Sequence, residues 1–596
     1  MIALTMLWWS FLRLATQSGR NSKGDVDPDD LYTAIFTSLA LGYAACGWIG
    51  LILIRASLTH VSISLICVTI AVATTTCTRG SAITLKSLGA TLLEDLRTII
   101  KPQYGSQYLW RLSGLITILI LIVSIGPINQ PDAIDYHVGY IQQFFIHGRN
   151  IKDGGLHQGL LGLGDFANLS FIQEHTTWLI RTAQIIALIP LVFFLARHHS
   201  KPAFVLTFLL APVFIGWASV GKPMFLGDTC IAASYLVWRL KPSLRRATMV
   251  AVTIICGISF KVSAMLITIP ILIDMFYWHR RHRKIDRTLQ DCCSAPMALL
   301  TALACTMLLT LFFYRQDITG NPFYPLASRL FTPHNVQAID FEEYLRNFSR
   351  DSFLFPLSII LPTSLGLLAS TLGPCAGLVC IKQIQALQTA SNHELHIRVV
   401  AIGQIILLIL FGQGRADYYA APLILLIFGS GSIENEAIKG LLHWLGKTIF
   451  GALLACQLIL FLTMASSSIY QSIATIFSYE TAMSQWAYGY DATNYLSSSP
   501  APHLNLAFRT PRMFYKEDYV DQDRFNLCLL QKDHSKQTQS KSFSTCIRDL
   551  GVRSLMTHRG VLDDPKNFRC SPANVVLGQR NPFNNKRIEV DICVAN

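Results

Sequence analysis

Long apolar runs recur along this chain, and they restrict its fold more than any other feature. Many approach the roughly 20 residues that an α-helix needs to cross a bilayer. They are continuous, whereas the strands of a membrane β-barrel would show alternating apolar and polar residues. Only 14% of the residues are charged, against about a quarter in soluble globular proteins. The sequence therefore predicts an all-α polytopic membrane bundle of about 11–13 transmembrane helices. The predicted spans lie near residues 33–54, 60–77, 109–126, 176–196, 202–217, 225–238, 247–260, 262–278, 295–314, 353–380, 397–411, 419–433 and 448–466.

Basic loops alternate with polar loops between these runs, and this alternation predicts an orientation. The basic loops are expected on the cytoplasmic side under the positive-inside rule; they are 78–108, 197–201, 239–246, 279–287 and 434–447. The loops expected on the other face are 127–175, 218–224, 315–352 and 412–418. Residues 1–32 then form a cytoplasmic or interfacial segment. The net charge of +13 is explained by these short loops, so nucleic-acid binding is not expected.

Residues 467–596 differ in character from the bundle, because polar and charged residues become frequent and no further span follows. Short β-like runs near 575–577 and 588–590 are separated by proline-containing breakers. We expect a small extracytoplasmic α/β or α+β domain here. Its four cysteines are typical of two disulfides on an oxidising face, in any of three pairings; they are Cys528, Cys546, Cys570 and Cys593.

Two carboxylates and an imidazole stand close to the end of an apolar run in the first long outer loop. These residues are Asp132, Asp135 and His137. Ionisable groups at a membrane boundary are costly and are usually functional. A carboxylate at this position can act as a general base, and the set could also hold a divalent cation. The structural alternative is that Pro131 and Asp132 only begin an interfacial helix.

A second polar group lies further along the same loop and ends at Glu174 and His175, where the next span begins. It could contribute to ligand binding or serve only as an interfacial anchor and helix cap. It also includes His157, Asp165 and Asn168. The glycine-rich stretch 159–164 is expected to make the loop flexible, and it lacks the strand and helix of a nucleotide-binding loop.

Three cations are embedded in apolar surroundings and are candidates for binding an anionic ligand. Lys222 lies in a short outer turn, Lys261 inside an apolar run, and Arg415 in a turn late in the bundle. A lipid-linked phosphate would supply anionic oxygens at this depth; snorkelling or an internal ion pair is the alternative. Asn321, in the Gly-Asn-Pro-Phe-Tyr-Pro segment 320–325, belongs to a rigid aromatic loop that suits a polyprenyl chain or a sugar.

The order of these motifs resembles that of bacterial integral-membrane glycosyltransferases of the GT-C superfamily, which includes protein O-mannosyltransferases and aminoarabinose transferases. Asp-Tyr-His at 135–137 is followed by Lys-Pro at 222–223 and Phe-Lys-Val-Ser at 260–263. The Gly-Asn-Pro segment and the Arg415 turn come next. The C-terminal segment 547–555 is similar to the outer domain of uncharacterised members. The resemblance covers most of the chain from about residue 109 onward.

The resemblance implies transfer of a sugar from a polyprenyl-phosphate donor to a glycan, lipid or protein acceptor, on the outer face of a bacterial inner membrane. It implies that Asp132 or Asp135 is the catalytic base or a metal ligand. It also implies that Lys222, Lys261 and Arg415 bind the phosphate of the donor. The chain lacks the adjacent Asp-Glu pair of better-known members in this loop, which leaves the identity of the base and the need for a metal open.

Two other functions fit the sequence. A transporter or flippase of a lipid-linked or anionic solute would use Lys261 within the membrane and the broken spans at 202–278, although its halves should be related by symmetry. A non-catalytic envelope assembly protein would use the outer domain to bind a partner.

Overall fold

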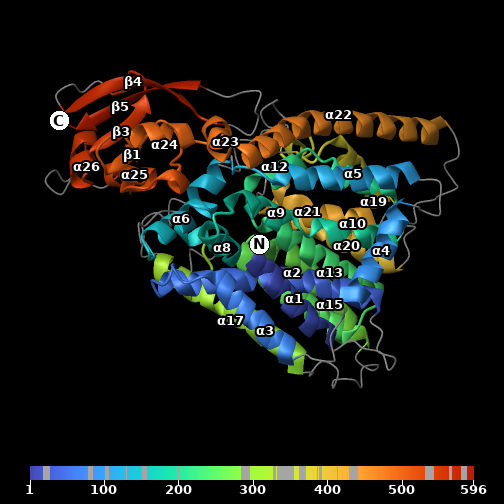
Figure 1. Ribbon diagram of the computed structural model, residues 1–596. Coiled ribbons are helices and arrows are strands. Elements are labelled where there is room, and N and C mark those ends of the chain that lie inside the picture. Colours follow the sequence, from blue (N-terminus) through green and yellow to red (C-terminus); the bar gives the residue numbers. More distant parts are fainter. Residues whose placement is uncertain are drawn as a thin grey trace.

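The structure is a computed structural model of the 596-residue chain. It describes residues 1–17, 27–77, 85–100, 107–128, 130–150, 157–198, 200–282, 295–325, 331, 355–361, 371–385, 387, 392–411, 414–428, 441–530, 542–562, 567–578 and 587–595. The described part forms a helical bundle with a small sheet domain at one end (Figure 1).

Most helices of the bundle fall on predicted apolar runs, whereas α1 and α4 lie outside them. They are α1 (Ile2–Gln17), α2 (Pro28–Arg55), α3 (Ile63–Cys77), α4 (Leu85–Ile100), α5 (Gln107–Ser124), α9 (Ile180–Ile185), α10 (Leu188–Arg197), α11 (Pro202–Leu209), α12 (Val213–Val220), α13 (Met224–Leu240), α14 (Leu244–Phe260), α15 (Ala264–His282), α17 (Ala295–Thr319), α19 (Pro374–Gln385), α20 (Asn392–Leu410), α21 (Ala420–Phe428) and α22 (Leu441–Phe477). The predicted span 202–217 is two short helices, because a non-helical break at 210–212 separates α11 from α12. Part of the predicted span 353–380 lies outside the described residues.

Within the described residues, five helical segments are long and apolar enough to cross a membrane by length and composition. They are Pro28–Arg55, Thr177–Arg197, Ala295–Thr319, His393–Leu410 and Gly446–Phe477. Several of these segments leave large apolar side chains uncovered; Leu410 is 73% exposed and Phe313 is 68% exposed. Apolar surface of this extent is unusual on a soluble protein and indicates association with a membrane.

The N-terminal segment forms the helix α1, which packs along α2 and α3. Its first residue lies at the end of the bundle where α2 finishes, and the Met1 amino group is 3.2 Å from Glu174 Oε2. Its last turn lies at the opposite end, where the Arg245 guanidinium donates to the Ala15 carbonyl at 3.0 Å. The helix therefore runs beside α2 in the opposite direction.

Side chains from the predicted basic loops meet at that opposite end of the bundle. Arg246 Nε lies 2.6 Å from Asp30 Oδ1, and Arg197 Nη1 lies 2.7 Å from Asp95 Oδ1. Asp95 belongs to α4, an amphipathic helix within the predicted basic loop 78–108. The basic loops that contain Arg197 and Arg246 are thus gathered at one end, away from the candidate site.

The C-terminal domain follows α22 and carries a five-stranded mixed sheet in the order β2-β1-β3-β5-β4. Its elements are α23 (Tyr479–Trp486), α24 (Tyr490–Leu496), β1 (His503–Asn505), β2 (Tyr519–Val520), α25 (Gln522–Leu530), α26 (Phe543–Asp549), β3 (Ser554–His558), β4 (Phe568–Val576) and β5 (Arg587–Ala595). Its start shifts from 467 to about 479, because α22 continues to Phe477. Both predicted β-like runs fall in the antiparallel strands β4 and β5.

The four cysteines of this domain form two disulfides, which resolves the three pairings left open by the sequence. Cys528 pairs with Cys546 and joins α25 to α26. Cys570 pairs with Cys593 and joins β4 to β5 at directly opposite positions.

The described residues of loop 127–175, which we call the outer loop after its predicted side, form short helices between the bundle and the C-terminal domain (Figure 1). They are η1 (Ala133–His137), α6 (Gly139–Ile146), η2 (Gln158–Leu160), α7 (Leu163–Phe166) and α8 (Asn168–Gln173). Its glycine-rich stretch is closely packed, contrary to the expected flexibility. A Cβ on Gly162 would lie 2.0 Å from the Phe260 carbonyl oxygen, and one on Gly164 would lie 2.4 Å from the Pro223 ring. These glycines let the loop approach the turns that carry Lys222 and Lys261.

Candidate functional site

The acidic stretch of the outer loop adopts a π-helix, η1, in which the Val138 amide donates to the Ala133 carbonyl at 2.8 Å. Turns of this kind are rare and are frequently found at functional sites. Pro131 and Asp132 begin the helical stretch that continues into η1, as the structural alternative expects. Asp132 makes no side-chain capping hydrogen bond, however.

The Asp132 carboxylate instead lies among three cations from distant parts of the chain. Its Oδ2 accepts from Lys222 Nζ at 2.6 Å and lies 3.6 Å from Arg415 Nη1. Its Oδ1 accepts from Arg509 Nη1. Burial opposes ionisation, but Lys222, Arg509 and Arg415 outweigh it and hold the pKa of the Asp132 carboxyl well below its ordinary value. Asp132 is thus an anion that holds these cations together.

Asp135 is more deeply enclosed than Asp132, and both of its oxygens are engaged by arginines. Arg509 Nε donates to Oδ2 at 2.5 Å, and Arg512 Nη1 donates to Oδ1. Arg512 is itself 1% exposed and also pairs with Asp521. Charge-assisted hydrogen bonds of this kind are stronger than neutral ones. Asp135 therefore secures the C-terminal domain against the outer loop.

Arg509 and Arg512 are site residues that sequence analysis missed. They come from the C-terminal domain, 374 and 377 residues beyond Asp135. Each guanidinium also lies over a ring of the outer loop, Arg509 at 5.5 Å from the Tyr136 centroid and Arg512 at 4.4 Å from that of Tyr140. The only available signal was that two carboxylates beside an apolar run require partners.

The three predicted cations converge at the same end of the bundle. Lys261 Nζ lies 4.7 Å from the Tyr418 ring centroid and interacts electrostatically with Arg415 and Asp417. Arg415 Nη2 is 3.3 Å from Asp417 Oδ2. Lys222 interacts with Arg415, Asp417 and Lys261 in addition to Asp132. We call Lys222, Lys261, Arg415 and Arg509, with Asp132, the cation centre.

His137 lies behind Asp132 in η1 and pairs with a different carboxylate. Its Nδ1 is 2.7 Å from Asp165 Oδ1, and both side chains are buried. The second oxygen of Asp165 accepts from the Gly162 amide at 2.8 Å. His157, from the same loop, stacks on the Tyr136 ring and accepts from Arg509 at 3.2 Å.

The other predicted site residues make their contacts elsewhere. Glu174 accepts from the Met1 amino group and from Ser64. His175 ends α8 with a positive φ of 54°. Asn321 accepts from the Phe323 amide at 2.9 Å and so shapes its own loop. No described contact joins these three residues to the cation centre.

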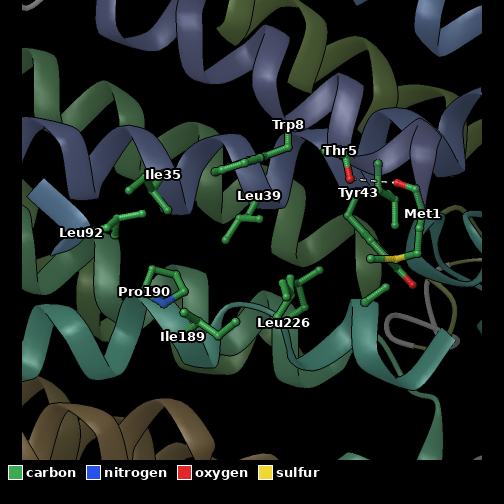
Figure 2. Close-up of a pocket in the computed structure, with 13 residues that line it drawn as sticks. Met1, Thr5, Trp8, Ile35, Leu39, Tyr43, Leu92, Ile189, Pro190 and Leu226 are labelled. Atoms are coloured by element: carbon green, nitrogen blue, oxygen red, sulfur yellow. Dashed lines mark hydrogen bonds between the residues drawn. The ribbon is translucent and has the colours of Figure 1, made fainter. Parts of the chain in front are cut away.

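An apolar cavity of about 310 Å³ opens between α1, α2, α4, α9, α10 and α13 (Figure 2). Its lining is Met1, Leu4, Thr5, Trp8, Ile35, Leu39, Tyr43, Leu92, Ala183, Ile186, Ile189, Pro190 and Leu226. Figure 2 shows Leu39 and Trp8 facing Ile189 and Leu226 across the space. Tyr43 packs on Phe260, with ring centroids 5.6 Å apart. Because Phe260 precedes Lys261 and Leu226 lies one turn beyond Lys222, this wall borders the cation centre.

The acidic residues do not fit the alternative of a divalent cation site. Among the residues described, no group of three or more His, Cys, Asp or Glu side chains lies close enough to hold a metal ion. The oxygens of Asp132 and Asp135 face arginine and lysine, and His137 faces Asp165. A cation held by Asp132 and Asp135 would have to displace these partners.

Comparison with known proteins identifies one partial match. Residues 318–484 match the family model described as the DUF1420 N-terminal domain. No curated protein and no solved structure matches the chain. The matched segment contains Arg415 and Asn321 but none of Asp132, Lys222, Lys261 and Arg509.

Proposed function

We propose that this chain is a membrane glycosyltransferase of the GT-C type. It moves a sugar from a polyprenyl-phosphate donor to an acceptor on the outer face of a bacterial inner membrane. The cation centre binds the phosphate of the donor, and the sugar lies between the bundle and the outer loop. The C-terminal domain is extracytoplasmic and contributes Arg509 to the site.

One observation carries the proposal. Lys222, Arg415 and Arg509 all approach Asp132 at the end of the bundle opposite the basic loops. With Lys261, four cations gather here against three carboxylates, Asp132, Asp135 and Asp417. The N–H groups of these cations match the oxygens of a phosphate. In a transfer reaction the same cations would stabilise the charge that develops on the leaving phosphate.

The apolar cavity supports a ligand that is lipid as well as phosphate. Its lining is almost entirely hydrocarbon and aromatic. One lining residue, Tyr43, packs on Phe260, which directly precedes Lys261 of the cation centre. A prenyl chain gains free energy by leaving water for such a surface. A free sugar phosphate has no group that would use it.

Asp132 is the carboxylate that would meet the acceptor. Cations engage both oxygens of each carboxylate, but the Asp132 side chain is 17% exposed and that of Asp135 only 5%. Of the two carboxylates that were expected to serve as the base, Asp132 is therefore the one that the acceptor can reach. In this proposal Asp132 accepts a hydrogen bond from the acceptor hydroxyl and orients it toward the sugar.

Binding of undecaprenyl phosphate to the full chain in lipid nanodiscs tests the proposal. Lys222→Met and Arg415→Gln should each weaken binding by at least about tenfold, because a charge-assisted hydrogen bond contributes about 1.5–3 kcal/mol and 1.4 kcal/mol is tenfold. The control is Lys241→Gln, which removes a cation at the opposite end of the bundle. Unchanged affinity in both site variants, or an equal loss in the control, would contradict the proposal.

A further inference from the structure

We propose that His137, held by Asp165, takes up the proton of the acceptor hydroxyl through its Nε2 atom. The inference rests on the proposed function and adds the residue at which the proton arrives. It assigns His137 as a catalytic residue and Asp165 as the residue that positions it.

The hydrogen bonds of the pair determine which ring nitrogen is free. Asp165 can only accept when ionised, so His137 Nδ1 donates to Oδ1 across 2.7 Å. A neutral imidazole carries one proton, and Nε2 is then the acceptor. Nε2 is buried, and none of the residues that the structure describes forms a hydrogen bond with it. A buried acceptor left without a partner is costly unless it has a use.

Further contacts hold Asp165 and His137 in this arrangement. Its second oxygen accepts from the Gly162 amide at 2.8 Å, and the buried Arg315 guanidinium acts on its charge. The backbone of His137 is fixed as well, because Asn168 Nδ2 donates to its carbonyl at 3.1 Å. The pair therefore presents Nε2 in one orientation, as a carboxylate does for the histidine of a hydrolytic triad.

The charged groups around the ring favour a neutral His137 before the reaction. Burial lowers the pKa of His137 more than Asp165 raises it, and Lys222 and Lys261 lower it further. Tyr136 lies beside the ring, with centroids 4.0 Å apart. The imidazole therefore begins the reaction able to accept a proton.

Asp132 and His137 then have different tasks. Asp132 directly precedes η1 and His137 ends it, and Lys222 and Lys261 of the cation centre act electrostatically on the His137 ring. The pKa of Asp132 is held far below neutrality, so this carboxylate orients a hydroxyl but keeps a proton poorly. A neutral imidazole is a stronger base than this carboxylate and can take up the proton during the transfer step.

The transfer step couples removal of the acceptor proton to the exchange of bonds at the anomeric carbon. The acceptor O–H proton passes to His137 Nε2, and the acceptor oxygen forms a bond to the anomeric carbon of the sugar. The bond between that carbon and the phosphate oxygen breaks, and its electron pair stays on the phosphate. The cation centre stabilises this anion, while Asp165 stabilises the imidazolium.

Nitrogen-15 NMR of the histidine-labelled full chain in lipid nanodiscs tests the inference, with undecaprenyl phosphate as the probe. The His137 signal is assigned by its loss in His137→Gln or, in the unaltered protein, by its contact with Tyr136. We expect Nε2 to be unprotonated without the probe. A bound phosphate anion should raise the proton affinity of His137 by at least about tenfold, or bring its titration into the observable range.

His396 is the matched control, because its Nδ1 lies 2.6 Å from Asp274 at the opposite end of the bundle; its titration should not change. Asp165→Asn should shift the protonated nitrogen of His137 without abolishing probe binding. A protonated Nε2 in the free protein, or a titration unmoved by bound probe, overturns the inference alone. Failure of the probe to bind at any concentration overturns the proposed function, and the inference with it.

Discussion

Arg509 of the C-terminal domain bonds Asp132 and Asp135 of the outer loop at the same time. The two carboxylates are three residues apart in sequence and stand at the junction of the bundle and the sheet domain. One guanidinium therefore links the cation centre to the contact between the two domains. The geometry of the site depends on how firmly the C-terminal domain is attached.

Replacing Arg512 with alanine should weaken that attachment most. Arg512 is buried and pairs with Asp135 and Asp521, so its loss leaves two buried carboxylates without this partner. Breaking a buried ion pair costs about 3–5 kcal/mol. We expect this loss in the free energy of unfolding, measured with denaturant in detergent. Arg559→Ala is the control, because its pair with Glu589 is exposed and should contribute nothing measurable. Equal effects of the two variants would show that the Arg512 contacts are not formed.

Acid should weaken the same junction only at low pH. The pKa of Asp132 in the folded chain is well below its ordinary value of 3.8. Its ion pairs therefore stabilise the fold fully above that ordinary value, and this contribution is lost as the pH falls toward the lower folded pKa. The difference in unfolding free energy between the unaltered chain and Asp132→Asn should thus be constant near neutrality and shrink below about pH 4. A difference that already shrinks between pH 7 and 5 would place the folded pKa above its ordinary value.

The helical bundle and the polar sheet domain could be predicted, because each follows from the local distribution of apolar and polar residues. The convergence of Lys222, Lys261 and Arg415 could also be expected, since alternating spans return such turns to one face. The partners Arg509 and Arg512 could not, because the C-terminal sequence does not say which surface its domain contacts.

The close packing of the glycine-rich stretch could not be predicted from the sequence either. A run of glycines is compatible with mobility and with close backbone packing. Only the structure reveals that Gly162 lies against the Phe260 carbonyl. In the same way, the pairing of His137 with Asp165 depends on a loop path that local pattern does not specify.

Gly162→Ala tests this close packing. The added Cβ would lie 2.0 Å from the Phe260 carbonyl oxygen and 2.7 Å from that of Ser259, and backbone atoms cannot rotate away. Overpacking of this kind costs about 1–3 kcal/mol or more, seen as a lower unfolding temperature. The control is Gly446→Ala, since a Cβ there meets nothing within 4 Å and removing a helical glycine should be neutral or stabilising. A Gly162→Ala protein as stable as the control would contradict the packing of this loop against the bundle.

The pair of Lys222 and Asp132 allows the roles of cation and carboxylate to be separated. Lys222 Nζ is 2.6 Å from Asp132 Oδ2, and the side chains are 6% and 17% exposed. Lys222→Met and Asp132→Asn should each destabilise the chain, whereas the double variant should lose less than their sum, with a coupling of about 1–3 kcal/mol. The pair of Lys241 and Asp27, 60% and 30% exposed, should give a coupling below about 1 kcal/mol.

The same three site variants should respond differently to undecaprenyl phosphate. Lys222→Met removes a donor to the phosphate and should weaken binding. Asp132→Asn removes an anion that competes with the ligand for Lys222, Arg415 and Arg509, so binding should be equal or tighter while transfer is lost. If Asp132→Asn weakened binding as much as Lys222→Met does, the carboxylate would be needed to arrange the cations before the ligand arrives. The double variant distinguishes these cases. If Asp132 competes with the ligand, the double variant should bind undecaprenyl phosphate more tightly than Lys222→Met does.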